Sequence, residues 1–223
     1  ANDVADGCLE ERNAGLTNFG KQLVRECNRV GMVIDLSHVG ERACLETVEL
    51  SDSPVVATHV NIRELAPSVR NHREKTLIAI AESGGVVGVS PYGPMCWDGR
   101  PARRPSTEDF LRQLRRAVEL VGIDKVAIGT DYGVAKDMTW ISHVLSRSVK
   151  RFPEIFQEYA EAFGNSLDAR YCSGVASLAA WADFPQLLLD DGFERDEVAK
   201  IVGANLAGCF GEIWGLRQTG AAL

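Results

Sequence analysis

Short apolar runs alternate with amphipathic segments along much of the chain. Each run is rich in β-branched residues, lacks polar alternation and is followed by a loop; the runs cover residues 31–38, 54–59, 84–90 and 125–131. Such runs are typical of strands in a parallel sheet that is covered on both faces. The pattern therefore predicts four parallel strands.

Apolar residues at helical spacing occupy the segments between and around these runs. The predicted helices cover residues 17–29, 41–50, 74–82, 107–121, 153–163, 184–189 and 195–210. Ser106 and Asp109 form a capping pattern at the start of one helix, and Gly31 is a typical stop for another. Strand and helix alternation predicts the α/β class, with residues 1–223 forming a single domain.

The charge balance excludes a typical nucleic-acid-binding protein. The chain has 24 Lys and Arg against 31 Asp and Glu, a formal net charge of −7, whereas nucleic-acid binding uses a basic surface. No apolar run approaches the roughly 18 residues of a membrane-spanning helix, so we predict no membrane span. The chain opens at Ala1 without a start methionine or a signal segment, which indicates a processed or truncated product.

Cysteines are spread along the chain, and none belongs to a Cys-x-x-Cys pair. A chain of 223 residues does not depend on disulfide staples. We predict buried free thiols in preference to a disulfide framework or a thiolate metal site. Unpaired cysteines in turn favour a cytoplasmic location. The six residues are Cys8, Cys27, Cys44, Cys96, Cys172 and Cys209.

Three metal-competent side chains end predicted strands, namely His38, His59 and Asp131. The carboxyl ends of parallel strands meet at one face of an α/β fold, so these side chains are expected to converge. A lone histidine is more often a helix cap or a hydrogen-bonded core residue. Two strand-end histidines joined by a strand-end aspartate favour metal binding instead, and such ligands suit zinc or a similar first-row ion.

Alternation along a strand gives an expectation for the direction of both imidazoles. It places His38 on the face of Leu36 and His59 on the face of Ala57. Both rings are therefore expected to project with the apolar side chains of their strands and to need a partner there.

Arg70 follows the second histidine and is expected near the same face of the fold. A guanidinium there can bind a substrate carboxylate through two parallel hydrogen bonds. Further basic side chains are expected to face solvent as ordinary surface residues. These are Arg63, Arg100, Arg103, Arg104, His72 and His143.

The segments IDLSHVG, ATHVN, VRN and IGTDY occur in an order and spacing that resemble the membrane dipeptidase (renal dipeptidase) family of zinc peptidases. The blocks ADGCLE, GLTNFG, NRVGM, SGGVVGV and DGFERDEVAKIVGANL extend the resemblance over nearly the whole chain. The resemblance implies a TIM-type (β/α)8 barrel in which a carboxylate bridges two zinc ions. It also implies hydrolysis of dipeptides with a free C-terminal carboxylate, often with a D-residue there.

Residue by residue, the resemblance assigns a role to each candidate. His38 and His59 match the two histidine ligands of one zinc ion. Asp131 matches the strand-eight aspartate at the other zinc ion, which handles the proton of the bridging water. Arg70 matches the arginine that holds the substrate carboxylate.

The chain departs from the family pattern in what it lacks. It has no segment for the His-x-Asp pair of the first strand, the bridging glutamate of the third strand or a later histidine that steadies the intermediate. It therefore resembles strands five to eight with their helices, the C-terminal half of the barrel. Val60 replaces a usual serine, and Gly133 replaces a second aspartate beside Asp131, where it affects substrate choice.

We therefore expect a zinc-dependent dipeptidase whose full site needs an N-terminal half, supplied by the parent chain or a second polypeptide. Its substrate would be a dipeptide or a small amide, and association into a homo-oligomer stays open. One alternative is a non-catalytic dipeptidase-like subunit or pseudoenzyme. Another is a metal-dependent amidohydrolase that acts on a different small amide.

Overall fold

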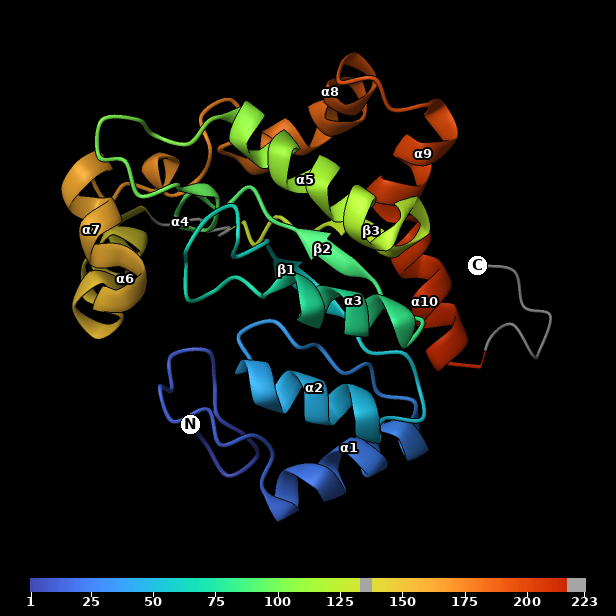
Figure 1. Ribbon diagram of the computed structural model, residues 1–223. Helices are drawn as coiled ribbons and strands as arrows, with labels where there is room; N and C mark the ends of the chain where they lie inside the picture. Colours follow the sequence, from blue (N-terminus) through green and yellow to red (C-terminus); the bar gives the residue numbers. More distant parts are fainter. Residues whose placement is uncertain (133–137, 216–223) are drawn as a thin grey trace.

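Three short parallel strands form the central sheet of the computed structural model, which describes residues 1–132 and 138–215. They are β1 (Ala57–Val60), β2 (Val87–Val89) and β3 (Val126–Ile128), in the order β1-β2-β3 (Figure 1). The strands β2 and β3 lie within predicted strands, and β1 overlaps the predicted strand 54–59 but ends one residue later, so three of the four predicted strands are confirmed, each shorter than predicted.

The fourth predicted strand, residues 31–38, is only a short extended segment. Asp35 forms a single parallel bridge to Val56. The Leu36 N–H donates to the Val56 carbonyl at 2.7 Å, and the Val56 N–H donates to the Ile34 carbonyl at 3.0 Å. The segment therefore runs beside β1, but the left-handed backbone of His38, with φ of 69°, ends the extended conformation.

Most helices lie where the apolar spacing predicts them. They are α1 (Asn18–Val30), α2 (Glu41–Leu50), α3 (Glu74–Glu82), α5 (Thr107–Val121), α7 (Pro153–Phe163) and α8 (Phe184–Asp190). The expected capping box of Ser106 and Asp109 is present at the start of α5. Gly31 ends α1 with φ of 69°, a left-handed conformation that favours glycine.

The predicted C-terminal helix, residues 195–210, is wrong as one continuous element. It consists of α9 (Arg195–Ala199), a π-helical turn η4 (Lys200–Ala204) and α10 (Asn205–Ile213). Gly203 leaves the helical conformation within the turn, and glycine has a low helix propensity. Two helices, α4 (Gly93–Cys96) and α6 (Met138–Arg151), were not predicted, nor were the 3-10 turns η1 (Ile123–Lys125), η2 (Asp168–Arg170) and η3 (Leu178–Asp183).

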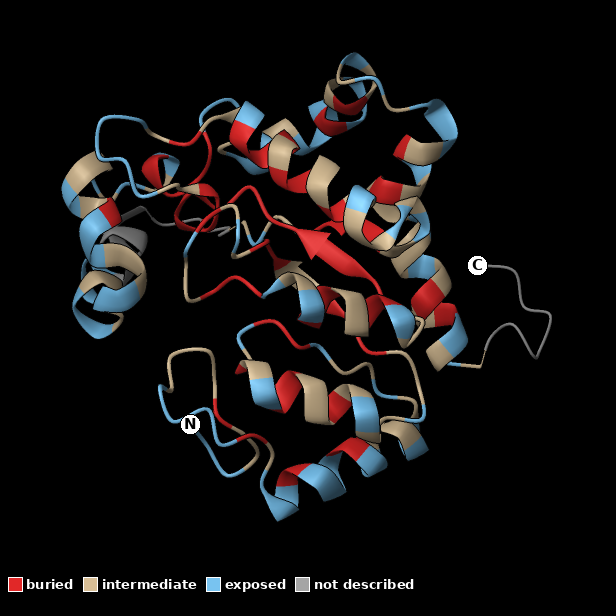
Figure 2. Cartoon of the chain, viewed as in Figure 1, coloured by how far each residue is buried: buried red, intermediate tan, exposed pale blue. Residues whose placement is uncertain are grey.

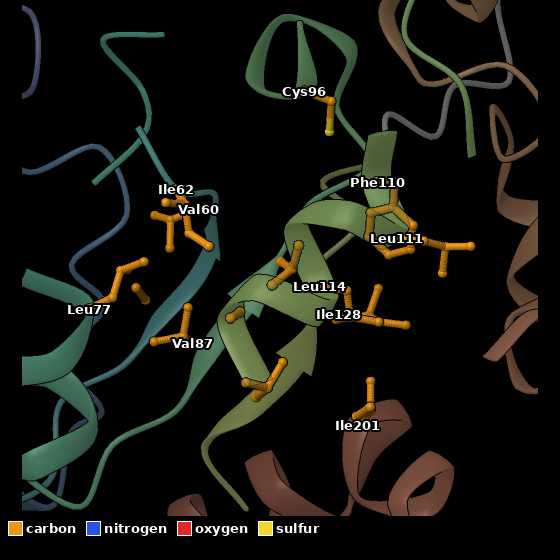
Figure 3. Packing of buried hydrophobic residues seen from close by; sticks show 14 of the residues in the cluster. Val60, Ile62, Leu77, Val87, Cys96, Phe110, Leu111, Leu114, Ile128 and Ile201 are labelled. Carbon is orange, nitrogen blue, oxygen red and sulfur yellow. The ribbon is translucent and has the colours of Figure 1, made fainter. Parts of the chain in front are cut away.

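The main hydrophobic core lies between the sheet and α2, α3, α5 and the C-terminal helices (Figure 3). Leu77 of α3 and Leu114 of α5 are fully buried against the strands, and Phe110 packs edge-on against Phe184 at 5.6 Å between ring centroids. This packing fixes the strands, and therefore the side chains at their carboxyl ends.

The second face of the sheet is covered by α10 at the end where the strands begin. Val56, Val86 and Ala127 form a small buried cluster with Cys209 of α10. Because Val56 and Val86 immediately precede β1 and β2, this cluster lies at the amino ends of the strands. Figure 1 shows α6 and α7 at the far end from α10, which leaves the carboxyl ends near those two helices.

All six cysteines are free thiols, as predicted. Four of them are buried and two, Cys8 and Cys27, are half-buried. No helix within residues 1–132 and 138–215 is both long and apolar enough to cross a bilayer.

Candidate active site

The structure brings the four predicted site residues together at the carboxyl ends of the strands. The imidazoles of His38 and His59 meet edge to face, with ring centroids 5.1 Å apart and planes at 65°. His38, Arg70 and Asp131 line one cavity of about 340 Å³. Side chains that are distant in sequence therefore share one site, as the parallel-strand argument predicts.

Two of these residues have an unusual backbone conformation. His38 has φ of 69° and Asp131 has φ of 51°, both in the left-handed region. Among the residues that the structure describes, Asn13 is the only other non-glycine residue with positive φ. Such conformations are uncommon outside glycine and gather at functional sites, where surrounding contacts hold them in place.

The direction expected for His59 from strand alternation is wrong. Ala57 and Val60 both lie in the main core although they are three positions apart, and the register of β1 against β2 shifts between them. The irregularity takes Thr58 and His59 out of strict alternation. The His59 ring contacts His38 and the Thr58 hydroxyl instead of packing in the core with Ala57.

The His59 imidazole has one bonded and one free nitrogen. Nδ1 lies 2.8 Å from the Thr58 hydroxyl. Nε2 is buried and has no hydrogen-bond partner among the described residues. Leaving such a nitrogen unbonded is costly, and a neutral imidazole nitrogen is a good ligand for a first-row metal. The residues present therefore fit a metal ion held from this side by His38 and His59.

The environment of His38 also suits a ligand role. Burial lowers its pKa to about 4, and electrostatic repulsion from the Arg70 guanidinium and from the neighbouring His59 acts in the same direction. His38 is therefore neutral near pH 7, which is the state that coordinates metal.

Asp35 lies behind the histidine pair. Burial raises the pKa of Asp35, but hydrogen bonds from Thr58 and Ser37 outweigh that effect, so the pKa lies below its ordinary value. The carboxylate is therefore ionised at neutral pH and accepts hydrogen bonds only.

Arg70 is a buried cation without a carboxylate partner among the described residues. The residue is only 3% exposed, and its Nη2 has no hydrogen-bond partner among the described residues. Nη1 lies 3.9 Å from the Cys8 sulfur. An unpaired buried charge is unfavourable, so the cavity beside Arg70 suits an anionic group such as a carboxylate.

A buried loop holds Arg70 in place and overturns two predictions. His72 is 4% exposed and its Nε2 donates to the Leu36 carbonyl at 3.1 Å, so it is no surface residue. Arg63 donates to the carbonyls of Asn71 and Val69 at 2.9 Å each, so it is no simple solvated charge. Arg63 thus provides donors for two loop carbonyls, and the Leu36 carbonyl provides an acceptor for the His72 ring, so these buried polar groups do not stay unpaired.

The remaining surface predictions are partly correct. Arg100 and His143 are exposed, as predicted. Arg103 is also exposed, as predicted, although it pairs with the buried carboxylate of Asp109, whereas Arg104 is half-buried and bonds the Asp168 carboxylate at 3.1 Å. These two arginines therefore tie the loop before α5 to other parts of the chain.

The family model of the membrane dipeptidases, peptidase family M19, matches residues 1–166. The chain belongs to the membrane dipeptidase family. Dipeptidase tcpJ of Claviceps purpurea is 30% identical over 118 residues, which cover 53% of this chain and 27% of that protein.

Solved structures are similar to this dipeptidase-family chain over most of its length. A metallopeptidase of Rhodobacter sphaeroides, liganded with a phosphinate mimic of the dipeptide L-Ala-D-Ala, has a TM-score of 0.68 and 26% identity, covering 90% of this chain and 48% of its own. An amidohydrolase of Pseudomonas aeruginosa has a TM-score of 0.77 and 26% identity, covering 96% and 62%. The chain spans less than two thirds of each of these three relatives. The half-barrel assignment stays a prediction.

A complete metal cage is not found in the described part of this dipeptidase-family chain. No group of three or more histidine, cysteine or carboxylate side chains within residues 1–132 and 138–215 is arranged to hold an ion. Gly133, the other departure from the family pattern, lies outside the described residues.

Sequence reasoning missed the apolar wall of the cavity. Phe152, just before α7, and Ile155 and Phe156, in its first turn, line the cavity together with Leu167. The Arg170 guanidinium lies over the Phe156 ring at 4.4 Å. The clustering of apolar residues at positions 152, 155 and 156 was visible as helical spacing, but spacing alone does not distinguish a cavity wall from a core contact.

Proposed function

We propose that this chain carries the substrate carboxylate site and one side of the metal site of a zinc-dependent dipeptidase. The observation that carries the proposal is the buried, unbonded Nε2 of His59, whose ring meets that of His38, and His38 lines the same cavity as Arg70 and Asp131. Imidazole ligands suit zinc, and membership of the M19 family supports peptide hydrolysis.

In this proposal each side chain has a separate task. A bound metal supplies an activated water and polarises the scissile carbonyl. Arg70 binds the C-terminal carboxylate of the dipeptide and thereby orients the peptide bond. The Asp131 carboxylate accepts a proton from the attacking water and returns it to the amine that leaves.

The cavity wall favours a substrate with an apolar side chain. Phe152, Ile155, Phe156 and Leu167 offer carbon surface next to Arg70. A dipeptide bound through its carboxylate would place one side chain against this wall, where each buried methylene contributes about 0.8 kcal/mol. We therefore expect branched or aromatic side chains to be preferred over small polar ones.

The proposed partner is the N-terminal half of the same fold, in the parent chain or in a second polypeptide. Relatives extend well beyond the length of this chain. Phe19, Val30 and Met32, on and just after α1, are each more than half exposed, and Figure 2 shows the outer side of α1 in the exposed colour. The segment 31–38 pairs with β1 on one side, so its other edge is the natural position for a further strand.

A second candidate function is hydrolysis of another small amide. The solved relative from Pseudomonas aeruginosa is described as an amidohydrolase, and it has a higher TM-score than the metallopeptidase. A non-catalytic subunit is the third candidate, because the described residues hold only part of a metal cage.

Native mass spectrometry of the protein purified from its own host tests these candidates. We expect a complex that contains a companion chain or the parent polypeptide, with two zinc ions. That complex should hydrolyse L,L or L,D dipeptides faster than N-acyl amides, whereas the isolated 223-residue chain should have negligible activity. A preference for N-acyl amides supports the second candidate. If the protein purified from its own host is metal-free and inactive, this result supports the third candidate and contradicts the dipeptidase proposal.

A further inference from the structure

Asp35, Thr58 and His59 form a hydrogen-bonded chain. The Thr58 Oγ1 lies 2.5 Å from Asp35 Oδ2 and 2.8 Å from His59 Nδ1. This series of hydrogen bonds begins at the Asp35 carboxylate and ends at Nδ1 of His59, the ring nitrogen other than the free Nε2.

The position of each proton in this series of hydrogen bonds follows from which groups can donate and which can only accept. Asp35 already accepts hydrogen bonds from the backbone N–H groups of Ser37 and Thr58 at 2.9 and 3.0 Å, so the carboxylate acts as an acceptor. The single hydroxyl proton of Thr58 therefore goes to Asp35. The hydroxyl oxygen is then left to accept, and only a protonated Nδ1 of His59 can donate to it.

A second contact fixes the backbone of the same histidine. The Ser37 Oγ donates to Asp35 Oδ1 at 2.8 Å and accepts the His59 backbone N–H at 3.0 Å. Asp35 thus holds His59 by two routes, through Thr58 to the ring and through Ser37 to the main chain. No comparable side-chain hydrogen bond is found for His38 in the described part of the chain, so the two rings are positioned differently.

We propose that Asp35 and Thr58 are positioning residues that hold His59 as its Nδ1–H tautomer and so present an unprotonated Nε2 to a metal ion. The tautomer follows from the hydrogen bonds alone, whereas its use in metal binding rests on the proposed function. Outer contacts of this kind orient a histidine ligand and typically change metal affinity about 10-fold to 100-fold when removed.

The test uses nitrogen-15 NMR of histidine side chains in the metal-free full chain, at about pH 8, above the ordinary histidine pKa of about 6.5. We expect the wild-type protein to show His59 with a protonated Nδ1 and an unprotonated Nε2. Thr58→Val removes the hydroxyl at nearly constant volume, so both nitrogens should move toward values averaged over the two tautomers. Thr58→Ser keeps the hydroxyl and should restore the wild-type pattern.

Ser37→Ala is the matched control, because it removes the hydrogen bonds of the Ser37 hydroxyl to Asp35 and to the His59 backbone N–H but leaves the Thr58 contact with the ring. It should keep the His59 tautomer. An unchanged backbone amide spectrum in Thr58→Val separates the tautomer effect from unfolding; if that variant unfolds, the wild-type pattern and the Thr58→Ser pattern still decide the tautomer.

Zinc titration by calorimetry then tests the consequence for metal binding. Thr58→Val should weaken zinc binding about 10-fold to 100-fold, and Thr58→Ser should recover most of the affinity. A wild-type His59 protonated at Nε2 overturns the proposal outright. Equal zinc affinity in wild type and Thr58→Val overturns the metal-positioning part. Absence of zinc binding in a wild-type protein that shows the expected tautomer overturns the proposed function and leaves the tautomer assignment standing.

Discussion

The imidazoles of His38 and His59 meet edge to face with centroids 5.1 Å apart, although 21 residues separate them in the chain. The pairing arises because one histidine ends the extended segment beside β1 and the other lies in β1 itself. Two imidazole rings this close form a nitrogen-rich corner beside the cavity that His38 lines.

The first prediction concerns zinc binding by this corner. His38→Ala and His59→Ala should each lower zinc affinity at least about 100-fold, because a partial site cannot lose one of two imidazole ligands and keep its affinity. Equilibrium dialysis with zinc provides the measurement. His143→Ala removes an exposed histidine and should bind zinc as the wild type does; equal losses in all three variants would contradict the assignment.

The second prediction concerns recognition of the substrate carboxylate by Arg70. Arg70→Lys keeps a positive charge but loses the planar donor pair, so binding of a dipeptide mimic should weaken by about 1.5–3 kcal/mol. Calorimetry on the zinc-loaded protein measures this change. A mimic with an amidated C-terminus should bind wild type and variant equally; if it also loses affinity in the variant, Arg70 is acting on something other than the carboxylate.

The third prediction follows from the burial of His72. Burial lowers its pKa to about 4, so the unfolded chain, with an ordinary pKa near 6.5, binds this proton more readily than the folded protein does. The stability that the neutral ring confers is fully present above about pH 6.5 and is lost as the pH falls toward 4, a total of about 3 kcal/mol.

Urea unfolding at about pH 7 and about pH 4.5 measures this effect. His72→Gln can keep the donor to the Leu36 carbonyl but cannot take up the proton, so its free energy of unfolding should depend less on pH. His143→Gln, at an exposed position, should show the wild-type dependence. An identical pH profile in both variants would show that His72 does not carry the acid sensitivity.

The fourth prediction tests the apolar wall of the cavity. Phe156→Ala in the active assembly should reduce the preference for dipeptides with large apolar side chains about 10-fold to 200-fold in kcat/KM, because the wall loses one of its two phenylalanine rings. Phe163→Ala is the matched control on the same helix. Phe163 packs against Trp97 and Tyr159 and does not line the cavity, so this variant should lose stability without changing the substrate preference.

The fifth prediction tests the proposed seam with an N-terminal half. Phe19→Asp places a charge on the exposed apolar side of α1 and should weaken association with the companion half at least about tenfold, while the melting temperature of the isolated chain changes little. Lys21→Asp alters charge elsewhere on the same helix and should have a smaller effect. Native mass spectrometry of mixtures measures both; association that survives Phe19→Asp would place the seam elsewhere.

The apolar spacing along the chain determined most of the secondary structure. The bounds of α2, α3, α5 and α7 agree with the predicted ranges, because each helix has a regular apolar face and end signals within a few residues of its termini. The convergence of His38, His59, Arg70 and Asp131 followed from the rule that parallel strands end on one face. These features depend on local pattern and on general topology, which a sequence carries directly.

Only the tertiary structure decided the features that depend on partners distant in sequence. The irregular register between Ala57 and Val60 arises from pairing with β2, and it turns His59 toward Thr58 and His38. His72 lies in a polar stretch of the sequence, yet the ring is buried, and its Nε2–H bond to the Leu36 carbonyl offsets the cost of that burial. Hydrogen-bond partners and cavity walls are assembled by packing between elements, so no local pattern specifies them in advance.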